Sequence, residues 1–310
     1  MTDKPLDAPL LDRTDSSLAR PLPPALGRAR ADVLAGAHDL LAIPEAALAR
    51  PWSWIDGGED EVRYAAYRAA EALEQAEIEA RAAASAGEAT ERHASRIIGP
   101  STAARWDLHG LLLPLDDRLL DADPGGEEWS LRLVLGHVIS GQRAYAWGSA
   151  WWLEQGLDAT DPDRPASIPD SVWETLPDEL TTEAEGTLED LRTRLDGTLD
   201  LSAERFAGLP DDRLDVGARW SGFPVTIGFR LGRWGSHIRE HAIQVEKTLA
   251  MIGHVPSEPA RLVRHVLSAY GRAEAVVFGR QGVDKSVDRV AKGAAEARQA
   301  IHAGREAAGI

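Results

Sequence analysis

The chain has 310 residues, a formal net charge of −16 and no cysteine. This length allows one large domain or two smaller ones. The lack of cysteine excludes disulfides, thiolate ligands and a cysteine nucleophile, so a tightly bound transition metal must use His, Asp or Glu. The acidic balance disfavours nucleic acid as a partner, because its phosphates would be repelled. Without a long apolar run or a secretory leader, we expect a cytoplasmic protein that does not contact membranes.

Helical periodicity covers nearly the whole chain after its N-terminal segment. Residues 1–26 are rich in proline and charge, and we expect them to form a disordered tail. Apolar residues then recur at spacings of three and four, while alternation over strand lengths is missing. The pattern therefore predicts an all-α protein. The expected helices are 29–49, 60–86, 102–121, 129–155, 183–207, 225–252, 257–280 and 283–307.

Breaks rich in glycine, proline and acidic residues divide these helices into three groups. We expect an N-terminal helical pair at 27–100, a helical bundle at 101–256 and C-terminal helices at 257–310 that pack on the bundle. Within the bundle, residues 156–180 hold four prolines and many acidic side chains. This composition is typical of a long connection or lid and not of a core element. Residues 209–226 are expected to form a second loop.

The segment GRWGSHIREHAIQ, residues 232–244, carries two histidines four positions apart. His237 and His241 project from one side of the predicted helix 225–252, beside its apolar stripe, so both imidazoles can reach one ion. The spacing also fits two histidines that merely bond to their neighbours. The same letters match the inverted zinc-protease motif with Glu240 as general base. That motif needs a further glutamate ligand in a mixed α/β domain, and no downstream glutamate is singled out here.

A third histidine lies on another predicted long helix. His137 neighbours the apolar side of the helix 129–155, and the residues along its own line, Gly141, Ala144 and Gly148, are all small. Small residues leave space beside an imidazole, either for close helix packing or for a ligand. One histidine from this helix and two from the other would form a three-histidine site with open coordination positions, as catalytic metal sites require.

The two histidine-bearing segments resemble the DinB-like superfamily of four-helix bundles with a metal site. The resemblance rests on WSLRLVLGHV, which contains His137, and on HIREH, which runs from His237 to His241. It covers residues 102–252, so the helices before and after this region are additions to the bundle. The resemblance implies that the three histidines bind a divalent transition metal, with zinc favoured and nickel or iron as alternatives.

The resemblance also implies an activity. The superfamily includes mycothiol- and bacillithiol-dependent S-transferases, a mycothiol-dependent maleylpyruvate isomerase and the iron-binding bundle of ergothioneine sulfoxide synthases. We therefore expect a metal-dependent S-transferase or isomerase that uses a low-molecular-weight thiol on a small-molecule substrate beneath 156–180. Glu240 is the candidate proton acceptor, and Arg230, Arg233 and Gln244 are candidate contacts for the cosubstrate.

Two alternatives to an enzyme remain open. The first is a non-catalytic metal-binding or stress-response bundle, in which the metal holds two helices together. The second is a bundle with a vestigial site that binds a small molecule. The number of metal ligands does not separate these alternatives from the enzyme, and a homodimer is left open as well.

Overall fold

The computed structural model describes residues 22–55, 58–86, 92–157, 160–161 and 163–310. Helices make up 68% of the structure, so the prediction of an all-α fold is confirmed. The long helices are α1 (Pro24–Leu41), α2 (Tyr64–Ser85), α3 (His93–Leu112), α4 (Leu131–Gln155), α6 (Leu188–Phe206), α8 (Ile227–Met251), α9 (Glu258–Ala275) and α10 (Asp284–Ala307). None of the described helices is both long enough and apolar enough to span a membrane.

The remaining elements are short. Single helical turns occur at α5 (Asp170–Trp173), α7 (Asp211–Leu214), η3 (Glu45–Ala47), η4 (Asp117–Leu119) and η5 (Glu179–Glu183), the last of which is a π-helical turn. Two antiparallel hairpins pair β1 (Pro51–Trp52) with β2 (Asp60–Glu61) and β3 (Gly217–Trp220) with β4 (Phe223–Thr226).

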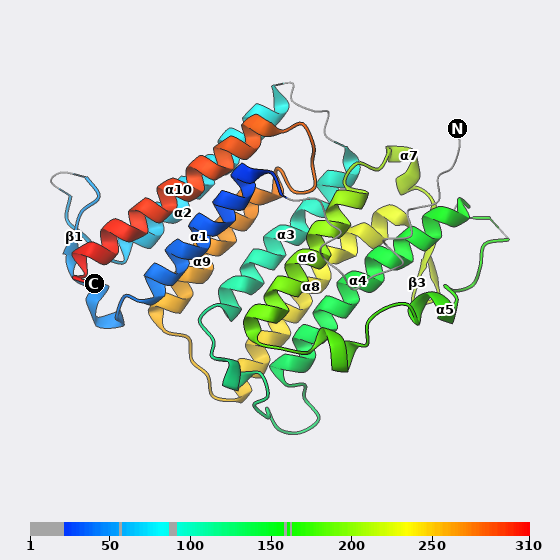
Figure 1. Ribbon diagram of the computed structural model, residues 1–310, viewed down its shortest axis with the longest axis horizontal. Coiled ribbons are helices and arrows are strands. Elements are labelled where there is room, and N and C mark those ends of the chain that lie inside the picture. The colour runs from blue at the N-terminus through cyan, green and yellow to red at the C-terminus, as the bar shows by residue number, and fades with distance from the viewer. Residues whose placement is uncertain (1–21, 56–57, 87–91, 158–159, 162) are drawn as a thin grey trace.

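Two four-helix bundles lie side by side (Figure 1). One consists of α3, α4, α6 and α8, and its buried apolar residues form one core cluster. The other brings α1 and α2 together with α9 and α10, which are far away in the sequence, around a second core cluster. Helices α3 and α9 pack against each other and join the two bundles.

A buried ion network also links the bundles. Arg105 on α3 lies 2.6 Å from the carboxylate of Glu274 on α9, and Arg30 on α1 lies 2.8 Å from the same carboxylate. Arg30 and Arg105 also bind Asp200 on α6, at 2.6 and 2.8 Å. Burial by itself raises the pKa of Glu274, but the two arginines lower it to about 2, so its carboxylate stays charged. The network therefore gives both Arg30 and Arg105 two acidic partners.

Side-chain caps position the two helices that carry the histidines. Ser130 accepts a hydrogen bond from the Leu133 backbone amide at the start of α4, and Thr226 accepts one from Phe229 at the start of α8. Each cap satisfies an amide that has no partner within its helix. The caps therefore fix the residue at which each helix begins. Because side-chain direction depends on position along a helix, they also help to fix the directions of the side chains in the following turns.

The first helix of each bundle differs most from the sequence prediction at its two ends, and α1 and α3 end at Leu41 and Leu112 where the sequence predicted ends at 49 and 121. Helix α1 begins at Pro24, inside the predicted tail 1–26, while residues 1–21 of that tail lie outside the described residues. Helix α3 begins at His93 and continues through Pro100, although the sequence predicted a start at 102. Ile98 belongs to the bundle core, so tertiary packing overrides the tendency of a proline to end a helix.

The segment 209–226, predicted as a loop, contains the hairpin β3–β4. Ser221 and Gly222 form its two-residue turn, and both have positive φ angles, 47° and 85°. Such turns match the twist of two short antiparallel strands. Four-residue strands give too little alternation to be recognised in a sequence. The hairpin places Arg219 and Trp220 beside α8, where they contact Arg230.

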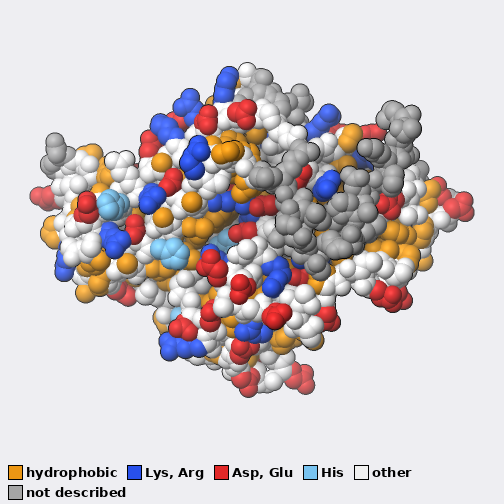
Figure 2. Space-filling view, in the orientation of Figure 1, with side chains coloured by type: hydrophobic (Ala, Val, Ile, Leu, Met, Phe, Trp, Pro, Cys, Tyr) orange, Lys and Arg blue, Asp and Glu red, His pale blue; other side chains and the backbone are white. Residues whose placement is uncertain are grey.

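Charged side chains of both signs are scattered over the surface. On the face shown in Figure 2, acidic and basic residues are interspersed with apolar ones. Such alternation of positive and negative side chains is expected for a surface with many solvated ion pairs. Each of these pairs contributes little to stability.

Candidate metal centre

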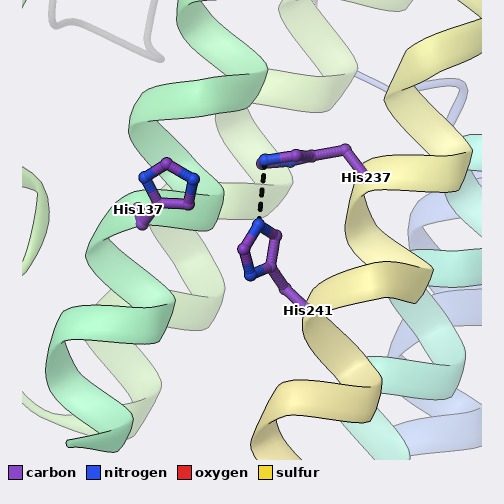
Figure 3. A group of neighbouring side chains, drawn as sticks. All are labelled: His137, His237 and His241. Carbon is purple, nitrogen blue, oxygen red and sulfur yellow. Dashed lines mark hydrogen bonds between the residues drawn. The ribbon is translucent and has the colours of Figure 1, made fainter. Parts of the chain in front are cut away.

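Three imidazoles from two helices meet between α4 and α8 (Figure 3). His137 comes from α4, and His237 and His241 come from successive turns of α8. One ring nitrogen from each histidine lies within 4.8 Å of the others. The Nε2 atoms of His237 and His241 are 3.0 Å apart. The histidine pair on one helix and the single histidine on the other are thus brought to one point.

The ring nitrogens that face away from this point have partners. His137 Nδ1 lies 3.0 Å from the Glu179 carboxylate, and His241 Nδ1 lies 2.7 Å from the Gln244 side-chain oxygen. An oxygen acceptor at Nδ1 holds the proton there and leaves the Nε2 lone pair available. Two of the three imidazoles are therefore oriented as metal-bound imidazoles are in proteins.

The third imidazole has an amide as its partner. His237 Nδ1 lies 3.2 Å from Gln142 Nε2, while the buried Gln142 Oε1 has no hydrogen-bond partner among the described residues. The oxygen and nitrogen of a glutamine amide exchange places when the group rotates by a half-turn. In the rotated amide, Oε1 accepts the Nδ1–H of His237, while the hydrogen bond that Nε2 donates to the Trp234 carbonyl at 3.3 Å in the present orientation is given up. His237 then presents Nε2 to the site, as His137 and His241 do.

Burial and mutual repulsion keep the α8 histidines neutral. Burial, followed by the charges of His241 and His137, lowers the pKa of His237 to about 3. Burial also lowers the pKa of His241, although its hydrogen bond to Gln244 acts in the opposite direction. Neutral imidazole is the form that binds a metal ion, so no proton has to leave these two rings at neutral pH.

This donor set fits a divalent transition metal. Three neutral imidazole nitrogens suit zinc, nickel and iron, and the partners on the outward nitrogens supply the usual second layer of contacts. Of the residues that the structure describes, His137, His237 and His241 form the one group of three or more His, Asp or Glu side chains able to hold an ion.

The other residues singled out in the sequence lie around this centre in different ways. Glu240 is exposed, and its carboxylate binds the guanidinium of Arg233 at 2.8 and 2.9 Å, which lowers the pKa of Glu240. Gln244 contacts His241 directly. Arg230 is buried and donates hydrogen bonds to Ser149 and to the backbone of β3. The hydrogen bonds described for Glu240 do not reach a histidine, although its negative charge acts to raise the pKa of His237.

Three residues near the centre were not singled out in the sequence. Glu179 comes from η5, in the connection between α4 and α6, and no local pattern marks it. Gln142 and Tyr145 lie on α4 one and two turns after His137, so helical spacing alone could have indicated them. The Tyr145 ring is 5.0 Å from His237 and 4.9 Å from Trp220, and burial raises the pKa of its hydroxyl.

One family model matches this chain. It is described as the DinB superfamily and covers residues 102–245, which include α4, α6 and the three histidines. Comparison with curated proteins and with solved structures returned no match. The family match, the helical bundle and the order of the histidines agree with the resemblance seen in the sequence. The match covers slightly less than half of the chain, and it supports the assignment of the bundle within residues 102–245 to the DinB superfamily.

Proposed function

We propose that this protein binds one divalent transition metal through His137, His237 and His241 and catalyses a transfer or isomerisation with a small thiol. The observation that carries the proposal is the convergence of three ring nitrogens within 4.8 Å, with acceptors at the outward nitrogens of His137 and His241. Membership of a superfamily that is generally metal-binding supports the same conclusion. Zinc is the favoured ion.

The ion would supply Lewis acidity. When bound, it lowers the pKa of a coordinated thiol or water enough to provide a nucleophile at neutral pH. The chain has no cysteine, so sulfur must come from a diffusible thiol. An electrophilic small molecule is the matching second substrate, because a thiolate attacks electron-poor carbon.

The chain's own residues orient and enclose the reacting groups. Glu179 holds the His137 ring, and Gln244 holds the ring of His241. Tyr145 lies against His237, and its raised pKa keeps the hydroxyl protonated, so that it can donate a hydrogen bond to a substrate. Trp129 packs 5.2 Å from His137 and is 39% exposed, so it lies where the centre approaches the surface.

Metal analysis of the purified full-length protein tests the first half of the proposal. We expect one ion per chain after loading and dialysis, and loss of most of it in His137→Ala or His237→Ala. His302→Ala is the matched control, because His302 is exposed on α10 in the other bundle. Full occupancy in the His137→Ala protein would show that the three-histidine site is wrong.

Cobalt-substituted protein tests the second half. Titration with mycothiol, bacillithiol and glutathione should produce a sulfur-to-cobalt charge-transfer band with at least one of them, followed by conjugation to a model electrophile. If the metal binds but no thiol alters the spectrum and no conjugate forms, the protein is a non-catalytic metal-binding bundle. Metal binding and thiol chemistry are thus decided separately.

A further inference from the structure

The side-chain amide of Gln142 contacts two groups with the same atom. Its Nε2 lies 3.3 Å from the Trp234 backbone carbonyl and 3.2 Å from Nδ1 of His237. A carbonyl oxygen can only accept hydrogen bonds, so the amide atom beside it must be the NH₂ group. The second hydrogen of that NH₂ group is donated to His237 Nδ1, which is therefore an acceptor. Gln142 is only 1% exposed, so water does not compete for these bonds.

This accepting nitrogen fixes the proton positions in both α8 histidines. A neutral imidazole carries one proton, so an accepting Nδ1 places the proton of His237 on Nε2. His237 Nε2 then donates to His241 Nε2, which lies 3.0 Å away (Figure 3). His241 must carry its own proton on Nδ1, which donates to Gln244 Oε1 at 2.7 Å. The hydrogen bonds thus run in one direction from Gln142 through both rings to Gln244.

The three histidines therefore differ in their readiness to bind an ion. His137 carries its proton on Nδ1, where Glu179 accepts it at 3.0 Å. His241 likewise carries its proton on Nδ1, so both rings offer an Nε2 lone pair. His237 instead directs an N–H group at the centre, and an N–H group cannot bind a metal ion. Before His237 becomes a ligand, its proton must move from Nε2 to Nδ1 by exchange with solvent, which leaves the charge of the ring unchanged.

The amide of Gln142 is the group that can adapt to this proton movement. The His237 ring is confined, because it lies 5.0 Å from the Tyr145 ring and directly against Gly141, where an added Cβ would be 2.6 Å from Cε1. Rotation of the amide by a half-turn only exchanges two atoms of similar size, and it brings Oε1 to Nδ1 as an acceptor. The rotated amide gives up its bond to the Trp234 carbonyl. This loss opposes metal binding.

We infer that Gln142 is a positioning residue that holds His237 in the tautomer unable to bind a metal ion, and that its amide turns over when an ion binds. The part that concerns the ion rests on the proposed function. Gln244 needs no such rotation, because it already accepts from Nδ1 of His241. The two glutamines that contact α8 histidines thus have opposite effects, since one favours the ligand form of its histidine and the other opposes it.

Nuclear magnetic resonance of the full-length protein with nitrogen-15 in its histidines tests the inference. The nitrogen chemical shifts distinguish a protonated ring nitrogen from an unprotonated one, and His237→Gln identifies the signals of that ring. In chelator-treated protein at neutral pH, we expect the proton of His237 on Nε2 and those of His137 and His241 on Nδ1. Loading with zinc should move the His237 proton to Nδ1 and leave the other two in place.

Two matched variants separate the tautomer from the effect of charge. Gln142→Glu replaces the amide by a carboxylate, which only accepts, so Nδ1 of His237 should be protonated even in the chelator-treated protein. Its zinc affinity should rise by about tenfold in a titration against a metal-binding dye. Gln244→Glu places the same charge against a histidine that is already protonated on Nδ1. This control should leave the proton positions unchanged and should increase zinc affinity by less than Gln142→Glu does.

Each outcome decides a separate part of the inference. A His237 proton on Nδ1 in the chelator-treated wild-type protein would overturn it, as would a tautomer that Gln142→Glu leaves unchanged. Zinc that binds while the His237 proton stays on Nε2 would exclude the rotation of the amide. Equal gains in zinc affinity in the two glutamate variants would assign the gain to charge and contradict the role of the tautomer.

The same measurements distinguish a failure of this inference from a failure of the proposed function. The proton position in chelator-treated protein requires no ion, so it decides the role of Gln142 even in a protein that binds no zinc. Absence of zinc binding would overturn the proposed function and the rotation of the amide, but not the tautomer. The comparison of wild-type protein with and without zinc requires no variant, so it remains decisive if Gln142→Glu does not fold.

Discussion

The imidazole of His237 occupies the space that a side chain at Gly141 would need. A Cβ atom added at position 141 would lie 2.6 Å from Cε1 of the His237 ring. Gly141 lies one turn after His137 on α4, and its lack of a side chain allows His237 to approach from the facing helix. The close packing of α4 against α8 therefore also brings His237 into the metal centre.

This relationship predicts the effect of a single added methyl group. Gly141→Ala should push the His237 ring out of place and weaken metal affinity by about tenfold or more, since displaced ligands and their supports cost this much. A competition titration against a metal-binding dye measures the change. Gly148→Ala is the matched control, because a Cβ there meets the Arg230 guanidinium instead of a histidine. Equal loss of metal affinity in both variants would contradict the prediction.

A second prediction concerns Glu179, the acceptor for His137. Glu179→Ala should weaken metal affinity by about 10- to 100-fold while leaving the three ligands intact, because the ring loses the contact that orients it. The same dye titration measures this effect. Glu185→Ala offers a control from an exposed position just beyond η5. Unchanged affinity in Glu179→Ala would mean that the hydrogen bond to His137 does not support the site.

The stability of the metal-free protein should depend on pH through His237. Its pKa is about 3 in the folded protein, against an ordinary value of 6.5. Between these values the unfolded state binds more protons. The free energy of unfolding should therefore fall with decreasing pH by at most about 1.4 kcal/mol per unit from this group. Above pH 6.5 it contributes no pH dependence.

Urea unfolding of chelator-treated protein at about pH 7 and about pH 5 measures this dependence. His237→Gln provides the comparison, because it lacks the titrating ring and should lose less stability over the same interval. The other titrating groups are common to both proteins and cancel in the difference. Parallel losses in the two proteins would show that His237 is not held neutral by its surroundings.

A fourth prediction concerns the contact between the two bundles. Glu274→Gln removes a carboxylate that neutralises the guanidinium groups of Arg30 and Arg105. The substitution should lower the free energy of unfolding by about 3 kcal/mol. Chemical denaturation followed by circular dichroism measures the loss. Glu296→Gln, at a half-exposed pair with Lys292 on α10, should change stability by less than about 0.5 kcal/mol. Equal effects of the two substitutions would exclude a role for the network in joining the bundles.

Local sequence determined the helical nature of the chain and the placement of its histidine pair. His237 and His241 are one turn apart, so a helix puts them on one side whatever it packs against. The small residues beside His137 likewise indicated a close neighbour, although not which one. The order of these histidines, the tryptophan ahead of His137 and the helical context together indicated the DinB superfamily, and the family match agrees.

Only the tertiary structure decided what each helix packs against. An apolar stripe shows that a helix must bury one side, but any other apolar stripe can cover it. For this reason, the pairing of α9 and α10 with α1 and α2 in a second bundle was not foreseen. The same holds for Glu179, whose partner His137 comes from a distant part of the sequence. The role of Glu179 depends on three-dimensional proximity, which is not encoded in the spacing of residues along the chain.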